Sequence, residues 1–469
     1  MQKQSNIMLK ERIMKEPPIL DHEFKPAYFE NIEYLNAVKE FCESEEIDIA
    51  IERDNNKVDV FHLNIFPQGI GMDKENLKYV ERLIKAILLI KGGWRIQIYG
   101  SDYIYYHIKK VFTSQPNGNF FYLFASKVYG KELTVELVTK KNMVLKKYDK
   151  TKEIKRIDKG SRIGIDVGGS DIKVVAVIDK EVVFSREIIW NPKENDNIQY
   201  HYEKLRSAIK MASKYLEHID FIGVSSAGII VDNEVKLAAL FKKVPESDSN
   251  DRVQKIYSNL AKEFNNVKCI VNNDGDITAL TLARNSNDIG ILGISMGTSE
   301  GAGYITRENC ISGWLNELSS VSIDYNKNAE MDWTYSQGCG GKYFSQQAVI
   351  RLAKKANIGF ESGLTDAEKL EKVQELIEKN NEKACEIFKT IGAYLGYTIP
   401  YYLQFYDIKR IIILGRLTSG KSGQIIADTA KKVLSSEFKD ICEKIEIVLP
   451  NESEKRVGQA ITVATFFSE

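Results

Sequence analysis

The sequence has few cysteines and few histidines. Only six of its 469 residues are cysteine, and no two of them form a C-x-x-C pair. This scarcity argues against a disulfide framework and against a cysteine zinc site, and it is typical of proteins kept in a reducing cytoplasm. Histidine occurs five times, and His22, His62 and His107 do not have the spacing of metal ligands. We therefore interpret these thiols and imidazoles as incidental or buried side chains.

A charge bias and a long apolar run are also missing. The 65 basic residues balance 65 acidic residues, which gives no electrostatic preference for nucleic acid or for anionic membranes. The strongest apolar helix pattern, residues 77–90, is interrupted by Arg82 and Lys85, and residues 1–25 lack the apolar core of a signal peptide. We expect a cytoplasmic protein that has no membrane or nucleic-acid partner.

The length of 469 residues predicts two or three domains, because a single core does not grow this large. Residues 1–155 predict an α+β domain of unknown role. Its expected elements are a hairpin over 47–63, a helix over 77–88, a strand over 94–99, a helix over 103–111, and strands over 120–124 and 133–138.

Residues 140–159 are rich in lysine and lose periodicity, which predicts a solvated linker. A basic nucleic-acid patch is the alternative, but no matching basic face occurs elsewhere. All the candidate site residues lie beyond this stretch. We therefore expect a chain that begins near residue 155 to retain nucleotide binding.

From Ser161 onward the pattern of elements occurs twice. Each half begins with three strands that can pair antiparallel, and it continues with strands that alternate with helices. This order predicts a mixed sheet covered by helices in each of two lobes, residues 160–287 and 288–469, with the C-terminal helix able to return to lobe 1. Such an arrangement binds ligands in the crevice between the two copies.

Two glycine-rich turns stand at matching places in the two halves. Their residues are Gly168, Gly169, Ser170 and Lys173 in the first half, and Gly297, Thr298 and Ser299 in the second. Glycines without a Cβ atom let backbone N–H groups approach an anion, and the hydroxyl groups add donors. One such turn would be weak evidence, but the pair indicates a two-lobed phosphotransferase with a nucleotide in its cleft.

Two aspartates are candidates for the chemistry. Asp166 precedes the first glycine turn and could hold Mg²⁺ directly or through water, although a structural cap of the turn is an equal alternative. Asp274 lies between a predicted strand and a predicted helix, where it could be the general base or could cap the helix. Asn273 beside it is suited to bind adjacent sugar hydroxyls, which favours the catalytic interpretation.

The order of these motifs resembles the ROK family of sugar kinases and sugar-responsive repressors, from about residue 163 to the C-terminus. The matching segments are 166–173 (D-x-G-G-T, with Ser170 for threonine), 222–228 (I-G-x-x-x-P-G, with Ala227 for proline), 273–276 (N-D-A-N), 297–298, and 391–396 followed by 411–416. The resemblance implies a duplicated actin/hexokinase-like (ribonuclease H-like) α/β fold, preceded here by a separate α+β N-terminal domain.

The resemblance also implies an ATP- and Mg²⁺-dependent carbohydrate kinase acting on a small sugar or polyol, as a homo-oligomer, a dimer. Asp274 would be the base and Asp166 the Mg²⁺ residue, with the two glycine turns on the phosphates. The residues expected at the acceptor are Ala227, Gly228, Asn273, Asp274 and Glu317, and those beside adenosine are Gly415 and Arg416.

The chain departs from the family pattern on the acceptor side. Family members with the metal site carry a histidine after a G-E-x-G-H run and a C-x-C-G-x-x-G-C zinc loop. Here residues 316–320 keep Glu317 but have no histidine, and residues 337–341 contain Cys339 alone. One thiol cannot build a tetrahedral zinc site, so we predict no zinc. The same departures leave the identity of the acceptor open.

Two other functions remain open. A sugar-sensing transcriptional regulator shares this fold, but it normally has a short winged-helix N-terminal domain, which the strand-rich first domain does not resemble. A non-catalytic ligand-binding protein is the second alternative. The presence of both Asp166 and Asp274 favours the kinase.

Overall fold

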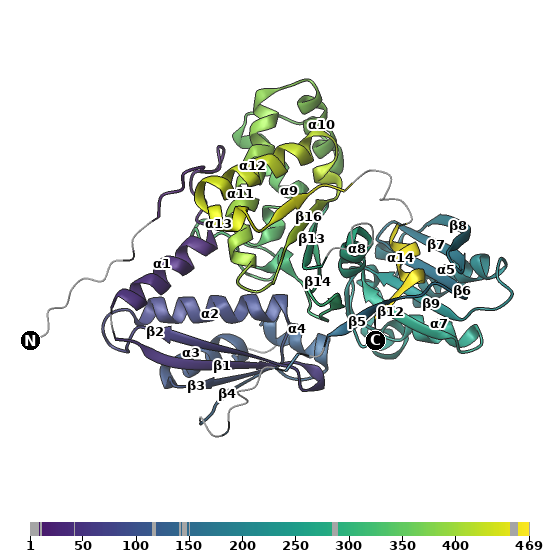
Figure 1. The fold of residues 1–469 in the computed structure, drawn as a ribbon, viewed down its shortest axis with the longest axis horizontal. Coiled ribbons are helices and arrows are strands. Elements are labelled where there is room, and N and C mark those ends of the chain that lie inside the picture. Colours follow the sequence, from purple (N-terminus) through teal and green to yellow (C-terminus); the bar gives the residue numbers. More distant parts are fainter. Residues whose placement is uncertain are drawn as a thin grey trace, which may run out of the picture.

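The computed structural model describes residues 9, 12–41, 43–114, 119–139, 142, 148–149, 151–283, 289–450 and 458–468. It has two lobes and an N-terminal domain that lies against lobe 2 (Figure 1). In that view lobe 1 is on the right, lobe 2 is at the top, and the N-terminal domain is at the lower left. No helix within the described ranges combines the length and the apolar character that a bilayer crossing requires.

The N-terminal domain has its own four-stranded sheet, in the order β2-β1-β3-β4. Its elements are α1 (Ala27–Glu40), β1 (Glu45–Glu52), β2 (Val58–Ile65), α2 (Asp73–Ile90), β3 (Arg95–Tyr99), α3 (Asp102–Thr113), α4 (Phe120–Tyr129) and β4 (Thr134–Leu137). Strands β1 and β2 form the predicted antiparallel hairpin, and β3 pairs in parallel with β4. This arrangement confirms the α+β character of the domain.

The predicted strand over residues 120–124 is wrong, because this segment is the first half of helix α4. Phe121, Phe124 and Val128 are buried at helical spacing, so one face of the helix holds the apolar side chains. The Asn119 side chain accepts a hydrogen bond from the backbone N–H of Tyr122 and caps the helix start, and Gly130 ends it in the left-handed conformation. The aromatic run suggested a strand because aromatic residues have high β propensity.

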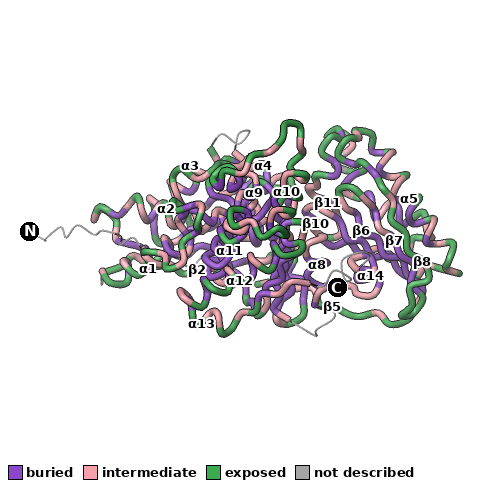
Figure 2. The backbone as a smooth tube through the Cα atoms, turned by 90° about the horizontal axis from the view of Figure 1, so that it is seen from above, coloured by how far each residue is buried: buried purple, intermediate pink, exposed green. Residues whose placement is uncertain are grey.

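Lobe 1 contains a five-stranded mixed sheet in the order β12-β9-β6-β7-β8. Its elements are β6 (Ser161–Val167), β7 (Asp171–Ile178), β8 (Glu181–Ile189), α5 (Ile198–Ser213), β9 (Phe221–Ser226), β10 (Ile229–Val231), β11 (Glu234–Leu237), α6 (Glu246–Asp248), α7 (Ile256–Glu263) and β12 (Lys268–Asn273). Strands β6, β7 and β8 are antiparallel, whereas β6, β9 and β12 run parallel. Strands β6 and β7 are mostly buried and β8 is mostly exposed at the rim (Figure 2).

Lobe 2 repeats this pattern in a seven-stranded sheet, in the order β17-β16-β13-β14-β15-β5-β18. Its elements include α8 (Asp274–Ala283), β13 (Ile291–Met296), β14 (Glu300–Ile305), β15 (Cys310–Ile311), α9 (Gln346–Lys355), α10 (Asp366–Glu378), α11 (Glu382–Tyr402), β16 (Arg410–Leu414), α12 (Lys421–Glu437), α13 (Lys439–Cys442) and β17 (Glu446–Val448). Strands β13, β14 and β15 are antiparallel, and β13, β16 and β17 run parallel. The repetition confirms the predicted duplicated actin/hexokinase-like fold.

Part of the predicted linker is a strand of lobe 2. Strand β5 (Lys152–Arg156) pairs antiparallel with β15 on one side and with β18 (Phe466–Ser468) on the other. Only Ile154 of this strand is buried, and the charged side chains around it hide the strand pattern in the sequence. Most of residues 140–150 lie outside the described residues.

The N-terminal domain and lobe 2 share one hydrophobic core. Buried side chains of α1, α2 and the first sheet are continuous with those of β13, β16 and helices α9 to α12. The Phe24 ring lies 4.8 Å from the ring of Tyr394 and 5.8 Å from that of Tyr343, measured between centroids. This shared core argues against our expectation that a chain beginning near residue 155 retains nucleotide binding.

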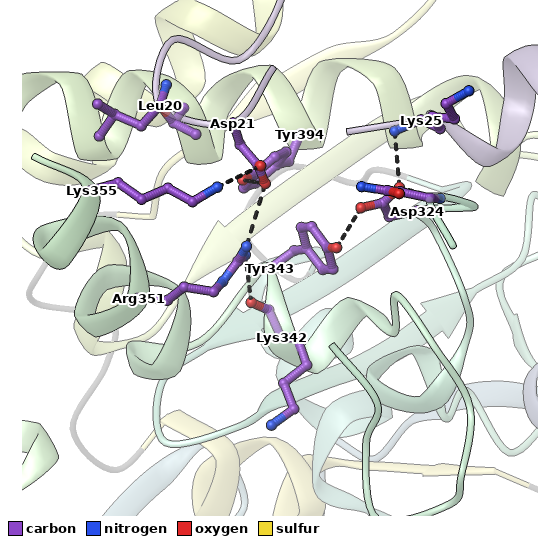
Figure 3. A network of polar contacts seen from close by, with 11 residues as sticks. Leu20, Asp21, Lys25, Asp324, Lys342, Tyr343, Arg351, Lys355 and Tyr394 are labelled. Carbon is purple, nitrogen blue, oxygen red and sulfur yellow. Dashed lines mark hydrogen bonds and ion pairs between the residues drawn. The ribbon is translucent and has the colours of Figure 1, made fainter. Parts of the chain in front are cut away.

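A polar network also fixes the segment that precedes α1 to lobe 2 (Figure 3). The buried Asp21 carboxylate accepts hydrogen bonds from Lys355 Nζ at 2.7 Å, from Arg351 Nη1 at 3.3 Å and from the Tyr394 hydroxyl. Burial alone would raise the pKa of Asp21, but these donors hold it below its ordinary value. The Asp324 carboxylate receives the backbone N–H of Lys25 at 2.9 Å. Buried hydrogen bonds therefore fix the segment before α1 to lobe 2.

Two helices lie where the lobes meet. Helix α8 packs on β13 and β14 of lobe 2, whereas helix α14 (Gly458–Thr465) packs on β6 and β9 of lobe 1. The two helices also contact each other, and in Figure 1 both lie between the two sheets.

Candidate functional site

The first glycine turn joins β6 to β7 and faces solvent. Gly169 and Ser170 are exposed, and the backbone N–H of Gly168 donates to the carbonyl of Asp171 at 2.9 Å. Trp190 holds the turn from behind, because its indole Nε1 donates to the Gly168 carbonyl at 2.9 Å and its backbone N–H donates to the Ser170 carbonyl at 3.1 Å. Sequence reasoning missed Trp190, since its distance from the turn along the chain gave no signal.

Asp166 lies at the end of β6, directly before this turn, and is buried. Its Oδ1 accepts a hydrogen bond from the Ser225 hydroxyl at 2.9 Å, and its Oδ2 lies 3.9 Å from Lys173 Nζ. Lys173 also donates to Asp171 Oδ1 at 2.8 Å. Burial raises the pKa of Asp166 to about 6, although Lys173 and Ser225 favour the ionised form. A carboxyl group therefore stands at the base of the turn.

The second glycine turn joins β13 to β14 at the corresponding place in lobe 2. Thr298 and Ser299 are exposed, and the Gly297 carbonyl accepts the backbone N–H of Gln346 at the start of α9. Gly415 follows β16 with φ of 104°, and a Cβ atom there would lie 2.3 Å from the Met296 carbonyl oxygen. Only glycine fits this contact, which places the turn carrying the exposed Arg416 beside the second glycine turn.

Asp274 stands at the junction of β12 and α8. Asn273 supplies the helix cap, because its Oδ1 accepts the backbone N–H groups of Gly275 at 2.8 Å and Asp276 at 3.3 Å. Its Nδ2 donates to the Gly228 carbonyl at 2.7 Å. The Asp274 side chain is half-buried, and its Oδ1 accepts the Gly275 N–H at 3.0 Å. Because Asn273 caps the helix, Asp274 is not needed for that role. Burial raises the pKa of Asp274.

Further carboxylates lie around Asp274. Burial raises the pKa of Glu317 to about 7, and the charge of Asp274 acts in the same direction. Asp276 is buried and its pKa is raised to about 7 by burial, although its Oδ1 accepts the Tyr304 N–H at 2.9 Å and Asn316 Nδ2 at 3.1 Å. Several carboxyl groups with raised pKa values at one place are typical of a functional site.

Gly228 and Ala227 lie on the lobe 1 side of this cluster. Gly228 has φ of 119°, and a Cβ atom there would lie 2.5 Å from the Leu237 carbonyl, so this tight turn requires glycine. The backbone N–H of Ala227 donates to the Val167 carbonyl at 3.3 Å, which keeps the turn next to the end of β6. The structure thus brings Ala227 and Gly228 next to the end of β6, the strand that carries Asp166.

The N-terminal domain holds the segment that carries Glu317. The carbonyls of Ile90 and Leu89, at the end of α2, accept the backbone N–H groups of Asn316 at 2.9 Å and Glu317 at 3.1 Å. The sequence predicts no catalytic or ligand-binding residues in this domain. Nothing in the sequence of α2 signals a contact with a segment so far along the chain.

A buried charge network fixes the residues that precede this segment. Lys91 Nζ lies 2.6 Å from Asp59 and 4.4 Å from the centre of the Trp314 ring. Trp314 Nε1 donates to Asp149 at 2.9 Å, and Arg53 pairs with both Asp59 and Asp149. Each buried charge therefore has an opposite charge beside it, as burial requires.

The loop at the position of the family's zinc site is packed without a ligand cluster. Cys339 is buried and its thiol donates to the Ser320 carbonyl at 3.2 Å. Within the described ranges no three His, Cys, Asp or Glu side chains are grouped so that they could hold a metal ion. That the protein binds no zinc stays a prediction.

The comparisons with known proteins agree with this architecture. A family model described as the ROK family matches residues 162–464. No curated protein matches the chain by sequence. Outside the family model lie the N-terminal domain with the linker, residues 1–161, and the last residues, 465–469.

Several solved structures share the fold at low sequence identity. A ROK hexokinase from Thermus thermophilus has a TM-score of 0.51 at 15% identity, covering 65% of this chain and 97% of its own. A ROK family transcriptional regulator, a homologue of the E. coli Mlc protein, has a TM-score of 0.52 at 14% identity, with 65% and 77% covered. A candidate N-acetylmannosamine kinase from Listeria monocytogenes has a TM-score of 0.50 at 12% identity, with 65% and 97% covered. Because the family model spans more than half of the chain, the protein belongs to the ROK family.

Proposed function

We propose that this protein is a kinase that transfers the γ-phosphoryl group of ATP to a hydroxyl group of a sugar or polyol. The observation that carries the proposal is the position of Asp274. Its half-buried carboxylate stands at the junction of the lobes, near Glu317, at the end of a strand that runs parallel to the one bearing Asp166. The family includes sugar kinases, and the Thermus thermophilus relative is a hexokinase.

In this proposal Asp274 is the general base that accepts the proton of the attacking hydroxyl. The Gly275 N–H occupies only Oδ1, which leaves carboxylate lone pairs for a substrate. Its raised pKa brings it closer to neutral pH, which improves a carboxylate as a proton acceptor. Asn273 caps α8 and so frees Asp274 from that role.

The two glycine turns would hold the phosphates of ATP. Gly168, Gly169 and Ser170 present exposed backbone and a hydroxyl from lobe 1, and Thr298 and Ser299 do so from lobe 2. Lys173 would add a positive charge behind the first turn. Gly415 and Arg416 would flank the adenosine, because their turn lies beside the second glycine turn.

The residues near the first turn also suit Mg²⁺. Mg²⁺ prefers oxygen ligands and is usually bound by one or two carboxylates together with substrate phosphates. Asp166 offers such an oxygen, directly or through water, beside the exposed turn. When bound with ATP, the ion would neutralise charge on the phosphates.

The acceptor would lie between Gly228 of lobe 1 and Glu317 of lobe 2. A carboxylate accepts hydrogen bonds from hydroxyl groups, and the N-terminal domain fixes the backbone of Glu317. Ala227 and Asn273 shape the opposite wall. Closure of the lobes would exclude water and so protect ATP from hydrolysis.

A sugar-sensing regulator is the second candidate, because a ROK transcriptional regulator shares this fold. Neither the four-stranded sheet of the N-terminal domain nor its attachment to lobe 2 favours that role. A non-catalytic ligand-binding protein is the third candidate, and the pair Asp166 and Asp274 argues against it.

The proposal is tested by measuring ADP release from ATP and Mg²⁺ in the presence of hexoses, amino sugars and polyols. We expect at least one acceptor to increase ADP release and to yield a phosphorylated product by mass spectrometry. The Asp274→Asn variant is the control for a contaminating kinase. If no acceptor in the panel increases ADP release above the rate with ATP alone, the kinase proposal is wrong.

A further inference from the structure

Helix α14 lies unusually close to the sheet of lobe 1. A Cβ atom on Gly164 of β6 would lie 1.9 Å from the Ala460 carbonyl oxygen, and one on Gly223 of β9 would lie 1.8 Å from the Val463 carbonyl oxygen. Any larger residue at these two places would push the helix away. The two glycines therefore allow the backbone of α14 to approach the strands that carry Asp166 and Ser225.

This close approach brings Gln459, in the first turn of α14, against Asp166. The orientation of the Gln459 amide follows from its neighbours, because a carboxylate can only accept. In that orientation Nε2 donates to Asp166 Oδ1 at 2.7 Å, lies 3.3 Å from Oδ2, and lies 3.3 Å from the Ser225 hydroxyl. Gln459 Oε1 accepts from the Thr278 hydroxyl.

The two carboxylate oxygens of Asp166 have different hydrogen-bond partners. Oδ1 receives both the Ser225 hydroxyl and the closer Gln459 N–H. Among the described residues, Oδ2 has the longer Gln459 contact and Lys173 Nζ at 3.9 Å. The donors on Oδ1 thus fix the rotation of the carboxylate and leave Oδ2 with accepting capacity.

Gln459 also connects the two lobes. Thr278 belongs to α8 and lies one helical turn after Asp274, so one side chain of α14 touches both the Asp166 carboxylate and the helix that carries Asp274. A shift of α14 would therefore disturb the contacts of Gln459 with both the Asp166 carboxylate and α8.

We propose that Gln459 is a positioning residue that orients Asp166 toward the Mg²⁺–nucleotide complex and sets its place relative to α8. This inference rests on the proposed function, since it assumes that the protein binds ATP with Mg²⁺. Outer partners of metal-binding side chains act in this way in many proteins, because they fix the orientation of the ligand.

The test compares Gln459→Met with the wild-type full chain. Methionine keeps the length and volume of glutamine but cannot donate a hydrogen bond. Calorimetry with the ATP analogue AMPPNP, at a series of Mg²⁺ concentrations, gives the half-saturating Mg²⁺ concentration. We expect Gln459→Met to raise that concentration about 10-fold. We expect AMPPNP affinity without Mg²⁺ to stay within about twofold, since the phosphate turns are intact.

The matched control is Thr462→Val on the same helix. The buried Thr462 and Thr281 hydroxyls lie 2.9 Å apart and join α14 to α8 without touching Asp166. This variant should leave the Mg²⁺ dependence unchanged. Ser225→Ala, which removes the other donor to Oδ1, gives an independent test if Gln459→Met folds poorly, and should shift the Mg²⁺ dependence in the same direction.

The outcomes separate the two proposals. If wild-type protein does not bind AMPPNP with Mg²⁺, the kinase proposal fails and this inference fails with it. If wild type binds AMPPNP but both Gln459→Met and Ser225→Ala keep its Mg²⁺ dependence, only the role of Gln459 is overturned. That role is also overturned if Thr462→Val shifts the dependence as much as Gln459→Met, because the effect would then come from the packing of α14.

Discussion

The two lobes have the same order of strands, but their buried side chains come from different parts of the chain. The main core of lobe 1 consists of side chains that lie between Ile163 and Val271, and a smaller cluster adds Ala460 and Ala464 of α14. The core of lobe 2 runs from Phe24 to Ile447 and includes the N-terminal domain. Lobe 2 and the N-terminal domain are thus one packed unit, and lobe 1 is the other.

The N-terminal domain makes few contacts with lobe 1 and extensive contacts with lobe 2. Toward lobe 1 it offers a small apolar cluster in which Phe124 and Val128 of α4 meet Ile229 of the β10–β11 hairpin, and Asn55 donates to Asp232 at 3.3 Å. Toward lobe 2 it offers the shared core, the Asp21 network and the backbone contacts to Asn316 and Glu317. We therefore expect lobe closure to move lobe 1 against a rigid unit of lobe 2 and the N-terminal domain.

The largest effect should follow from deletion of residues 1–151. Without them the Tyr343, Tyr394 and Tyr397 side chains would lose buried neighbours, and lobe 2 should not fold. Circular dichroism and limited proteolysis would reveal this loss, and co-expression of residues 1–151 as a second chain is the control. A folded deletion variant that binds ATP like the full chain would show that the shared core is dispensable.

Asp274→Asn should come next, with a change in rate and not in folding. The residue lies between the two packed units, so its loss should leave the stability of both nearly unchanged. Loss of the general base should lower kcat roughly 10²–10⁴-fold while acceptor affinity changes little. Steady-state kinetics with the acceptor identified in the panel measures both quantities. Near wild-type turnover would remove Asp274 from the role of base.

Phe24→Ala should show that the shared core of lobe 2 and the core of lobe 1 can be destabilised independently. Truncating this buried ring should cost about 3–5 kcal/mol of unfolding free energy. Amide hydrogen exchange should become faster in both α2 and β13, while β6 and β9 keep their protection, because Phe24 belongs to the shared core.

Phe241→Ala in the core of lobe 1 is the matched control, and it should have the opposite pattern. Faster exchange confined to residues 12–41 in Phe24→Ala would show that the N-terminal segment is peripheral to lobe 2.

The smallest effect should be a change in pH dependence in Asp276→Asn. The pKa of Asp276 is about 7 in the folded protein, against an ordinary value of 3.8, so the folded state keeps a proton that the unfolded chain releases. The free energy of unfolding should therefore fall as pH rises from about 4 to about 7. Asparagine removes this contribution and can still accept from the Tyr304 N–H.

Urea unfolding of wild type and variant at several pH values measures that slope. We expect a flatter profile in Asp276→Asn and greater stability above about pH 7. Glu317→Gln, at a second carboxyl group with a raised pKa, should flatten the profile in the same direction. An unchanged slope in both variants would contradict the burial of these charges.

Much of the region that matches the ROK family was predictable from the sequence because its signals are local. The turn at Gly168 and the turn at Gly297 each follow an apolar strand, and the alternation of strands and helices specifies the mixed sheets. Residues close in sequence determine these features, so a single chain is enough to recognise them.

The errors and omissions all depend on contacts between distant segments. Strand β5 has one buried side chain, so only its partners β15 and β18 reveal it. Trp190, Gln459 and the end of α2 reach the site from places that carry no motif. Helix α4 was mistaken because its aromatic residues suit a strand until one face meets a core.

The sequence by itself thus determined the duplicated sheets, the two glycine turns and the candidate carboxylates, since short-range geometry and hydrophobic periodicity dictate them. Only the tertiary structure decided that the first domain completes the core of lobe 2, and that α14 returns Gln459 to Asp166. The physical reason is that burial and hydrogen bonding depend on which surfaces meet in the folded chain. Gly164 and Gly223 permit the close approach of α14, and the Phe24 ring fills part of the core of lobe 2, but neither contact is visible in the local sequence.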